Sequence, residues 1–449
     1  MHITRQADKE DKEGACTRCA QTEIPAISVP RSAAFAAKCI LTVFFAQSRS
    51  AMRFNETCNP SNPTNQRDSC PSIYKSCSIQ VGDSCSWRLV ILVLDLPGFG
   101  FISALTVASD GTRVVCTQSG IYTLPPTGLP TLLAGHITEA GFTDGQGGAA
   151  RFHYLSGIAM DGDGNVIVAD SDNHALHKVT RAGAVSTLVG NGQKGYMDGS
   201  GDAARFNQPQ GIAVDEDGTI YVADCYNHCV RQVAPDDWAV STLAGDGKAG
   251  AGFADGLGSS ARFCDPTGLA LDMDGDLIVA DSNNNCIRRV TTAEGRVTTV
   301  AGNAAYDQGC ADGEGATARF YAPKDMAVDG NSNILVADAH NYRIRMIAGA
   351  AACVTTVAGC DQLGKIDGTG ASVCFLTPRV LALDERGRLI VADGNRCCLR
   401  VVEASLEPPR QLTAARELFL QVRARSLACT FLRLFSLRVG PTLSGCCLA

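Results

Sequence analysis

The sequence predicts an all-β fold of the β-propeller class, in which small antiparallel sheets repeat around a central axis. The main observation is internal repetition. The tripeptide Val-Ala-Asp recurs at intervals of 54, 57, 57 and 55 residues, and its copies end at Asp170, Asp224, Asp281, Asp338 and Asp393. The composition agrees, because 46 glycines and only 6% aromatic residues favour many turns and short strands over a helical bundle.

Each repeat contains four candidate strands. In the unit that begins at Gln210, the runs GIAVD and TIYVAD are separated by the turn EDG, and HCVRQVA and AVSTLAG follow. One such sheet cannot bury both of its faces, so neighbouring units must stack. Five units are clear, and a weaker one over residues 102–135 precedes them. We therefore expect six blades with a repeat of about 55 residues.

The sixth unit ends near Val402 without a fourth strand, which would leave an open sheet edge. Residues 88–96, RLVILVLDL, form an apolar run just before the first unit. We expect this segment to complete the sixth blade and so to close the ring. The segment after Pro409 is the alternative donor.

Composition divides the chain into three regions. Residues 1–87 carry a net charge of +2 and residues 403–449 carry +3, which leaves −12 for residues 88–402. We interpret these regions as a cysteine-containing flank with little regular structure, a basic and apolar tail compatible with a helix, and the propeller itself. The acidic propeller disfavours nucleic acid as a partner, because such binding uses Lys and Arg to displace counterions. No run of 18 uncharged apolar residues occurs, so no transmembrane helix is expected.

The flanks contain features typical of an extracytoplasmic protein. The apolar stretch 33–46 has the length of a signal-peptide core, although it starts late and contains Lys38. Asn55 begins a glycosylation sequon, and four cysteines lie within residues 58–85. The 21 cysteines of the chain cannot all pair internally, because their number is odd. The tail 403–449 has three interpretations: a segment docked on the propeller, a segment at a membrane surface, or a wrongly predicted coding segment.

A longer motif runs through the repeats. It reads P-x-G-[IL]-A-[VL]-D, then Val-Ala-Asp, then an Asn-His step followed by an apolar-Arg step. The last part stands as NHALHKV, NHCVRQV, NNCIRRV and NYRIRMI, beginning at Asn173, Asn227, Asn284 and Asn341. Over residues 101–402 the chain thus resembles the NHL-repeat family of six-bladed β-propellers, although GNRCC replaces the motif in the last blade. Members of that family include protein-binding platforms, RNA readers, sensor ectodomains and, rarely, lyases, so the resemblance implies a fold and leaves several functions open.

A second repeated element, DGxGxxARF, contains an Asp and an Arg seven residues apart. The pairs are Asp144 and Arg151, Asp198 and Arg205, Asp255 and Arg262, and Asp312 and Arg319. Cys374 replaces the Arg in the fifth copy. A feature repeated around a ring builds the ring, whereas catalysis usually needs one constellation. We therefore interpret these residues as structural, with the Asp starting a turn and the Arg binding either loop carbonyls or the Asp. The Val-Ala-Asp aspartates are interpreted as caps of the following turn.

Function is expected where the blades differ. The chain direction places the inter-blade loops, the turns between second and third strands, and the start of each inner strand on one face. The residues that begin the inner strands are Ser156, Gln210, Thr267, Lys324 and Arg379, near the mouth of a central channel. Lys324 and Arg379 fall in adjacent blades and are either a site for an anionic group or solvated rim charges. The candidate binding residues of this face are His153, Tyr154, Gln210, Tyr226, Lys324, Asp325, His340, Arg379 and Arg396.

The sequence indicates no catalytic residue, metal site or cofactor. Neither H-E-x-x-H nor G-x-S-x-G occurs, and Cys16 and Cys19 lack a second cysteine pair at zinc-site spacing. Cys229, Cys286 and Cys398 share one repeat position, so we expect buried apolar residues there rather than disulfides. The first hypothesis is a non-enzymatic propeller that binds a protein or peptide on its loop-rich face. The alternatives are a metal-assisted lyase or lactonase that uses the channel and an RNA-binding propeller.

Overall fold

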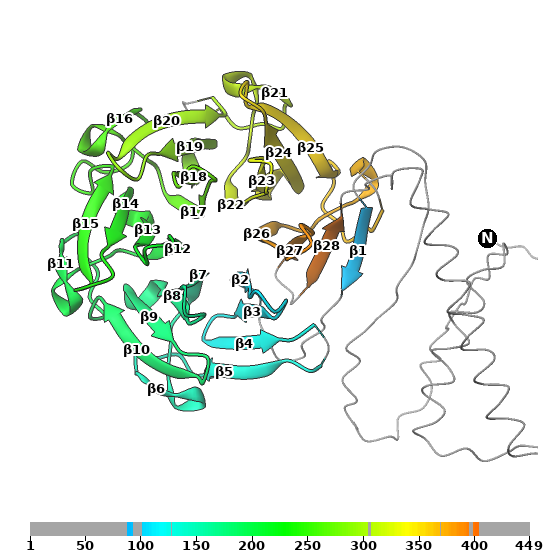
Figure 1. Cartoon of the computed structure of the whole chain (residues 1–449). Helices are drawn as coiled ribbons and strands as arrows, with labels where there is room; N and C mark the ends of the chain where they lie inside the picture. The colour runs from blue at the N-terminus through cyan, green and yellow to red at the C-terminus, as the bar shows by residue number, and fades with distance from the viewer. Residues whose placement is uncertain are drawn as a thin grey trace, which may run out of the picture. The chain divides into compact units, whose positions relative to one another are not determined.

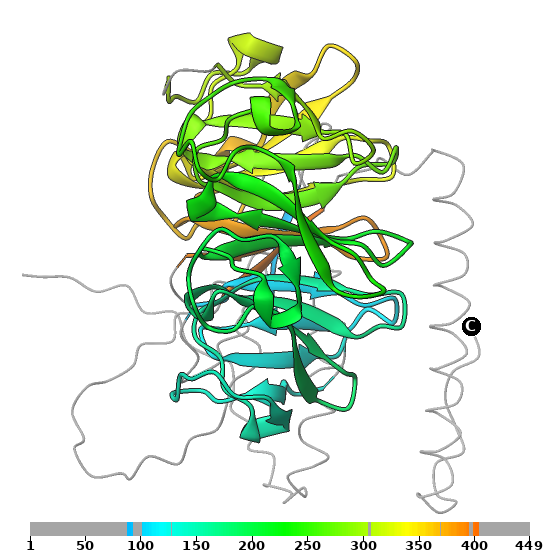
Figure 2. The ribbon, with the colours of Figure 1, turned by 90° about the vertical axis from the view of Figure 1, so that its left-hand side faces the viewer.

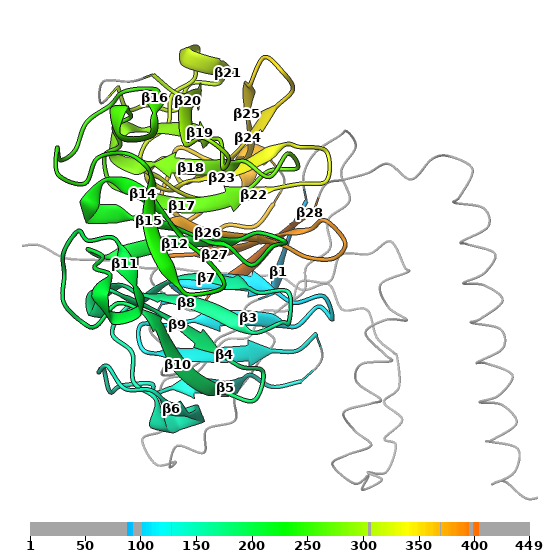
Figure 3. The ribbon, with the colours of Figure 1, turned by 60° about the vertical axis from the view of Figure 1, so that its left-hand side comes forward.

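Six antiparallel sheets form a ring around a central axis in the computed structural model of the chain (Figure 1). The structure describes residues 88–92, 101–126, 128–303, 307–368, 370–394 and 398–403. The side views show the hairpin turns of successive blades projecting in the same direction (Figure 2, Figure 3). This arrangement confirms the six-bladed β-propeller. The flank up to residue 87, most of the tail and Arg396 lie outside the described residues, so the interpretations of these segments stay predictions.

Each blade runs from an inner strand beside the axis to an outer strand at the rim. Blade 1 contains β2 Ala104–Val107, β3 Arg113–Cys116, β4 Gly120–Leu124 and β5 Thr131–Gly135. Blade 2 contains β7 Leu155–Met160, β8 Val166–Asp170, β9 Ala175–Val179 and β10 Ala184–Val189. Blade 3 contains β12 Pro209–Val214, β13 Ile220–Asp224, β14 Cys229–Val233 and β15 Ala239–Ala244. Blade 1 shows that the degenerate first repeat forms a full four-stranded sheet.

The second half of the ring repeats the same pattern. Blade 4 contains β17 Pro266–Leu271, β18 Leu277–Asp281, β19 Cys286–Val290 and β20 Arg296–Ala301. Blade 5 contains β22 Pro323–Val328, β23 Ile334–Asp338, β24 Arg343–Ala348 and β25 Cys353–Gly359. Blade 6 contains β26 Pro378–Leu383, β27 Leu389–Asp393 and β28 Leu399–Glu403.

The DGxGxxARF loops add a short fifth strand that the sequence analysis did not predict. Its two residues pair antiparallel with the outer strand of blades 2 to 5 and partly cover the rim edge. These strands are β6 Gly145–Gln146, β11 Gly199–Ser200, β16 Gly256–Leu257 and β21 Gly313–Glu314. A 3₁₀ turn follows each of them, η1 Gly147–Ala149, η3 Gly201–Ala203, η5 Gly258–Ser260 and η7 Gly315–Thr317, and η9 Gly370–Ser372 is the counterpart in blade 6.

The strand β1, Arg88–Leu92, closes the ring. It pairs antiparallel with β28, from Arg88 opposite Glu403 to Leu92 opposite Leu399, and so supplies the fourth strand of blade 6. This pairing confirms the donor predicted from the apolar run before the first blade. Blade 6 also packs on blade 1 through a buried cluster that includes Leu105, Val380 and Ile390. The two ends of the repeat array are therefore held together by hydrogen bonds and by apolar packing.

The hydrophobic core lies between the blades rather than inside any one of them. Each buried cluster combines residues from two neighbouring sheets, as when Ile167 of β8 packs with Val222 of β13. The phenylalanine that ends each DGxGxxARF-like loop is fully buried in one of these layers, and the set comprises Phe152, Phe206, Phe263, Phe320 and Phe375. The second repeated element thus contributes a large apolar side chain to each of five inter-blade layers.

A fully buried arginine in the third strand ties blades 3 to 6 to their loops. In blade 5, Arg345 donates to Asp338 at 2.8 Å and to Asp312 at 2.7 Å, and it lies over the ring of Phe320. The equivalent arginines are Arg231, Arg288 and Arg400. In blade 2, His177 takes this place, with its ring nitrogens 3.2 Å from Asp170 and 3.4 Å from Asp144.

The loop arginines take a different role from these buried ones. In the structure they donate to backbone carbonyls of their own loops, as Arg205 does to Ala204 and Arg262 does to Ala261 at 2.9 Å each. Arg151 and Arg319 make the same kind of contact. Of the two alternatives weighed for these residues, the structure thus shows the carbonyl contact. The loop aspartates Asp198, Asp255 and Asp312 pair with the third-strand arginines.

The cysteines of the propeller are mostly buried thiols. Cys229, Cys286 and Cys398 are buried and unpaired, which confirms the apolar role predicted for that position. Cys374, which replaces the loop arginine in the last copy, forms a disulfide with Cys360 that the sequence analysis did not predict. In the described part of the chain, no helix has the length and apolar character needed to cross a membrane.

Candidate functional site

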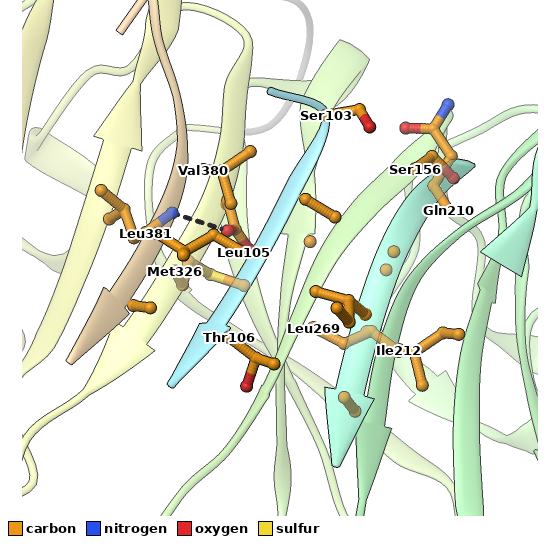
Figure 4. Close-up of a pocket in the computed structure, with 18 of the residues that line it drawn as sticks. Ser103, Leu105, Thr106, Ser156, Gln210, Ile212, Leu269, Met326, Val380 and Leu381 are labelled. Carbon is orange, nitrogen blue, oxygen red and sulfur yellow. Dashed lines mark hydrogen bonds between the residues drawn. The ribbon is translucent and has the colours of Figure 1, made fainter. Parts of the chain in front are cut away.

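The inner strands of the six blades line a central cavity of about 580 Å³. Its lining is graded along the axis, as Figure 4 shows. Ser103, Ser156 and Gln210 lie toward one end, and Leu105, Ile212 and Leu269 lie in the middle (Figure 4). The gradient arises because each inner strand begins with a polar residue and has an apolar residue two positions later, as in Gln210 and Ile212. The cavity therefore has a polar mouth above an apolar middle.

The polar mouth opens on the face that carries the turns between second and third strands. These 3₁₀ turns are η2 Ser171–Asn173, η4 Cys225–Asn227, η6 Ser282–Asn284 and η8 Ala339–Asn341. Their backbone bonds to the residues that precede each inner strand, as Tyr226 does to Asn207 and His340 to Tyr321. We call this side, with the inter-blade loops, the loop-rich face. The chain-direction argument is confirmed, because the turns and the starts of the inner strands lie together.

The opposite side, the hairpin face, is uniform. In each of blades 2 to 6 an aspartate at the end of the inner strand accepts backbone N–H groups two and four residues later, and so closes the turn to the second strand. These aspartates are Asp161, Asp215, Asp272, Asp329 and Asp384. The loop-rich face is where the blades differ.

The predicted aromatic and histidine residues are spread over the loop-rich face. Tyr226 is 50% exposed and the side chain of His153 is 54% exposed. Tyr154 lines the cavity and contacts the ring of Phe101 at a centroid distance of 5.9 Å. His340 packs edge-on against Tyr321 at 4.8 Å. The structure thus brings Tyr154 to the channel mouth and leaves Tyr226 and His153 exposed.

Two blades use hydroxyl groups at the mouth to hold the next blade. In blade 4, Thr267 donates to the carbonyl of Lys324 at 2.8 Å, and Ser282 donates to the carbonyl of Pro323 at 2.5 Å. In blade 2, Ser156 donates to the carbonyl of Pro209 at 3.0 Å, and Ser171 shares this acceptor. These hydroxyl groups therefore hold neighbouring blades together, and we call this arrangement the latch.

Blades 3, 5 and 6 lack this latch. The latch positions are occupied there by Gln210 with Cys225, Lys324 with Ala339, and Arg379 with Gly394. Within the described residues, the side chains of Gln210, Lys324 and Arg379 make no hydrogen bond or ion pair, although all three line the cavity. Arg379 is half-buried, and its Nε is fully buried without an acceptor. The mouth therefore contains two cationic side chains, Lys324 and Arg379, that form no hydrogen bond or ion pair with the described residues.

Asp325 occupies a position that is glycine in three other blades. A Cβ at Gly157, Gly211 or Gly268 would meet the backbone of the next inner strand, at 1.8 Å from the Gln210 carbonyl oxygen in the first case. Glycine is thus required where inner strands approach this closely. In blade 5 the carboxylate of Asp325 instead accepts the backbone N–H of Leu381 in blade 6 at 2.9 Å, the dashed line in Figure 4.

The cations at the mouth influence the titration of their neighbours. Burial lowers the pKa of Lys324 and Arg379 lowers it further, while Cys225 and Asp265 act in the opposite direction. Burial, Lys324 and Arg379 together lower the pKa of His340, so its imidazole is neutral at pH 7. Burial raises the pKa of Asp325 to about 7, although backbone N–H donors oppose the shift. The two cations thus act on each other and on the imidazole of His340 across the mouth.

The sequence analysis missed a repeated hydrogen bond between blades, in which a side chain of one blade accepts a backbone N–H just before the inner strand of the next; we call these contacts braces. His174 accepts the backbone N–H of Gln208 at 3.1 Å, and His228 accepts that of Asp265 at 3.2 Å. Asn285 makes the equivalent contact to Ala322 at 2.8 Å. The recurrence of Asn or His at one repeat position was the signal for this role.

Among the described residues, no group of three His, Cys, Asp or Glu side chains is placed to hold a metal ion.

Together, the ring of sheets and its polar mouth define the chain as a six-bladed β-propeller with a solvent-accessible central pocket. Three stretches, residues 152–179, 206–233 and 263–290, match the NHL repeat, so the chain is an NHL-repeat β-propeller.

Curated relatives and a solved structure agree with this assignment. The chain is 30% identical over 286 residues to the Arabidopsis thaliana chloroplastic protein SUPPRESSOR OF QUENCHING 1, which covers 60% of this chain and 27% of that protein. It is 27% identical over 350 residues to NHL repeat-containing protein 2 of Gallus gallus, which covers 68% of this chain and 46% of that protein. The chain thus spans between about a quarter and about half the length of these relatives. An auxiliary nutrient binding protein from Bacteroides ovatus is similar in fold, with a TM-score of 0.52, 13% identity, and coverage of 72% of this chain and 78% of that one.

Proposed function

We propose that this propeller is a non-enzymatic binding module whose partner is a protein or peptide that docks on the loop-rich face. One observation carries the proposal: the differences between blades gather on that face, around a polar mouth, while the hairpin face repeats the same turn. A rigid ring that varies on one side offers a specific surface at little conformational cost. Exposed Tyr226 and His153 provide the kind of side chain that anchors interfaces.

Site-directed photocrosslinking tests this proposal. A benzoylphenylalanine at Tyr226 reports on the loop-rich face, and one at Met273, which is 67% exposed in a turn of the hairpin face, is the matched control. We expect a defined crosslinked partner from position 226 and none from position 273. The double variant Tyr226→Ala, His153→Ala should reduce capture of the same partner by affinity purification.

The opposite results would overturn the proposal. Equal crosslinking from both positions would mean that the face does not select a partner. Capture that survives the double variant and comes only from position 273 would assign binding to the hairpin face. Tyr226 and His153 are both exposed, so the double variant should melt at the same temperature as the wild type. A matching melting temperature would exclude unfolding as the cause of reduced capture.

A further inference from the structure

Most buried and half-buried cations of the described residues have acceptors, but Lys324 and Arg379 do not. Arg231, Arg288 and Arg345 each bridge two carboxylates, and exposed Arg386 lies 3.9 Å from Glu385. Lys324 and Arg379 stand in adjacent blades at the channel mouth and contact no acceptor among the described residues. A half-buried charge without a partner is costly, and the cost is higher when a second cation lies nearby. Such an arrangement is typical of a site that is completed by an anion.

We propose that the mouth of the channel binds a carboxylate of the partner, either an acidic side chain or a chain terminus, between Lys324 of blade 5 and Arg379 of blade 6. This inference rests on the proposed function and names the chemistry that the partner must present. A guanidinium can bind a carboxylate through two parallel hydrogen bonds, and the ammonium group adds a point charge.

The surroundings of the two cations suit this ligand. The carboxylate that acts most on Lys324, that of Asp265, lies 3.1 Å from His228, and Asp325 is engaged by the backbone of Leu381. The carboxylate of Asp265 accepts a hydrogen bond from the side chain of Asn283, and neither carboxylate forms an ion pair with Lys324 or Arg379. The neutral imidazole of His340 adds a hydrogen-bonding group near the two cations, and the amide of Gln210 adds one at the same end of the channel, in blade 3.

The depth of the pocket also favours a group carried by a peptide. Below the mouth the channel wall consists of apolar side chains such as Met326, Ile212 and Leu269 (Figure 4). A charged group is held at the mouth, because deeper entry would remove its hydration without an acceptor or donor in return. The −12 charge of residues 88–402 opposes a polyanion such as a nucleic acid but admits a single carboxylate at a local cationic site.

Fluorescence anisotropy with the full chain tests this assignment. The probes are a fluorescein-labelled Gly-Gly-Glu amide, whose peptide part carries one carboxylate, and its neutral match, the Gly-Gly-Gln amide with the same label. We expect the acidic peptide to bind at least about tenfold more tightly, and its affinity to fall as salt rises. Lys324→Met and Arg379→Gln should each weaken acidic-peptide binding by about tenfold or more. Arg386→Gln is the control, because it removes the same charge from the hairpin face of the same blade.

Each outcome decides the matter. Equal binding of the two peptides, or full binding by both mouth variants, would overturn the site. Displacement of the peptide by inorganic phosphate at equal charge concentration would show that the site takes phosphate and would overturn the carboxylate assignment. If crosslinking from position 226 still captures a partner while the peptides are not distinguished, this inference fails and the proposed function stands. If position 226 captures nothing while the acidic peptide binds, the proposed function fails instead.

Discussion

The buried third-strand arginines with their two carboxylates, which we call the clamps, and the channel mouth both contain cationic side chains, but only the clamp cations form ion pairs within the fold. Arg345 is fully buried between Asp338 and Asp312 and contacts the ring of Phe320. Lys324, in the inner strand of the same blade, has no such partner among the described residues. The clamp recurs in four blades, whereas the residue that begins the inner strand is a hydroxyl residue in some blades and Gln210, Lys324 or Arg379 in others. The Nε atoms of the clamp arginines are buried without an acceptor, as in Arg379, but their other two nitrogens bind carboxylates in every copy, whereas no nitrogen of Arg379 does so among the described residues. Repeated ion pairing marks a structural role, and variation without an ion pair marks a surface left for a ligand.

The largest expected effect comes from breaking a clamp. Arg345→Met leaves Asp338 buried without its cation, and we expect a loss of about 3 to 5 kcal/mol in the free energy of unfolding. For a domain of this size that corresponds to a fall in Tm of roughly 5 to 8 °C. Chemical denaturation and thermal melting measure the change. A loss below about 1 kcal/mol would show that the clamp is not structural.

The second prediction concerns the carboxylate at the mouth. The pKa of Asp325 is raised from 3.8 to about 7, so the folded state holds its proton more tightly than the unfolded state. The stability contributed by this group is complete below pH 4 and is lost as the pH rises to 7. Asp325→Asn should therefore match the wild type at pH 4 and exceed it by roughly 2 to 4 kcal/mol at pH 8. Denaturation curves at several pH values test this, and a variant that is less stable at pH 8 would contradict it.

The third prediction compares a latched with an unlatched position at the mouth. Thr267→Val removes the hydroxyl that donates to the Lys324 carbonyl and should cost about 1 to 2 kcal/mol. Gln210→Ala removes a side chain with no hydrogen bond among the described residues and should change stability by less than about 0.5 kcal/mol. Equal losses in thermal melting would mean that the latch contributes nothing specific.

The smallest expected effect on stability comes from the cations themselves. Lys324→Met removes a half-buried charge that has no described acceptor, so stability should stay within about 0.5 kcal/mol of the wild type or rise slightly. Acidic-peptide affinity should fall in the same variant. A marked loss of stability in this variant would show that Lys324 has a structural role like that of the clamp arginines, and would contradict the difference argued between the two regions.

The sequence was sufficient for the fold because its repeat encodes local pairing. Alternating apolar residues and Asp-Gly turns set each four-stranded sheet, and the apolar run at residues 88–96 marked the closing strand that pairs with β28. The residues of the mouth were also identified, since the starts of the inner strands share one repeat position. The latches and braces were missed, because the acceptor of Thr267 lies 57 residues ahead, in the next blade.

The sequence by itself thus determined the number of blades, the order of their strands and the face on which they differ. Only the tertiary structure decided which charges are used. Arg345 binds Asp312 of the loop, which lies 33 residues earlier in the chain. The sequence spacing instead suggests Arg319, seven residues after Asp312, as one possible partner of that aspartate. Side-chain pairing across such separations depends on how the sheets stack, which a repeat of short strands does not specify. That stacking surrounds Arg345 with two carboxylates and leaves Lys324 and Arg379 facing the channel.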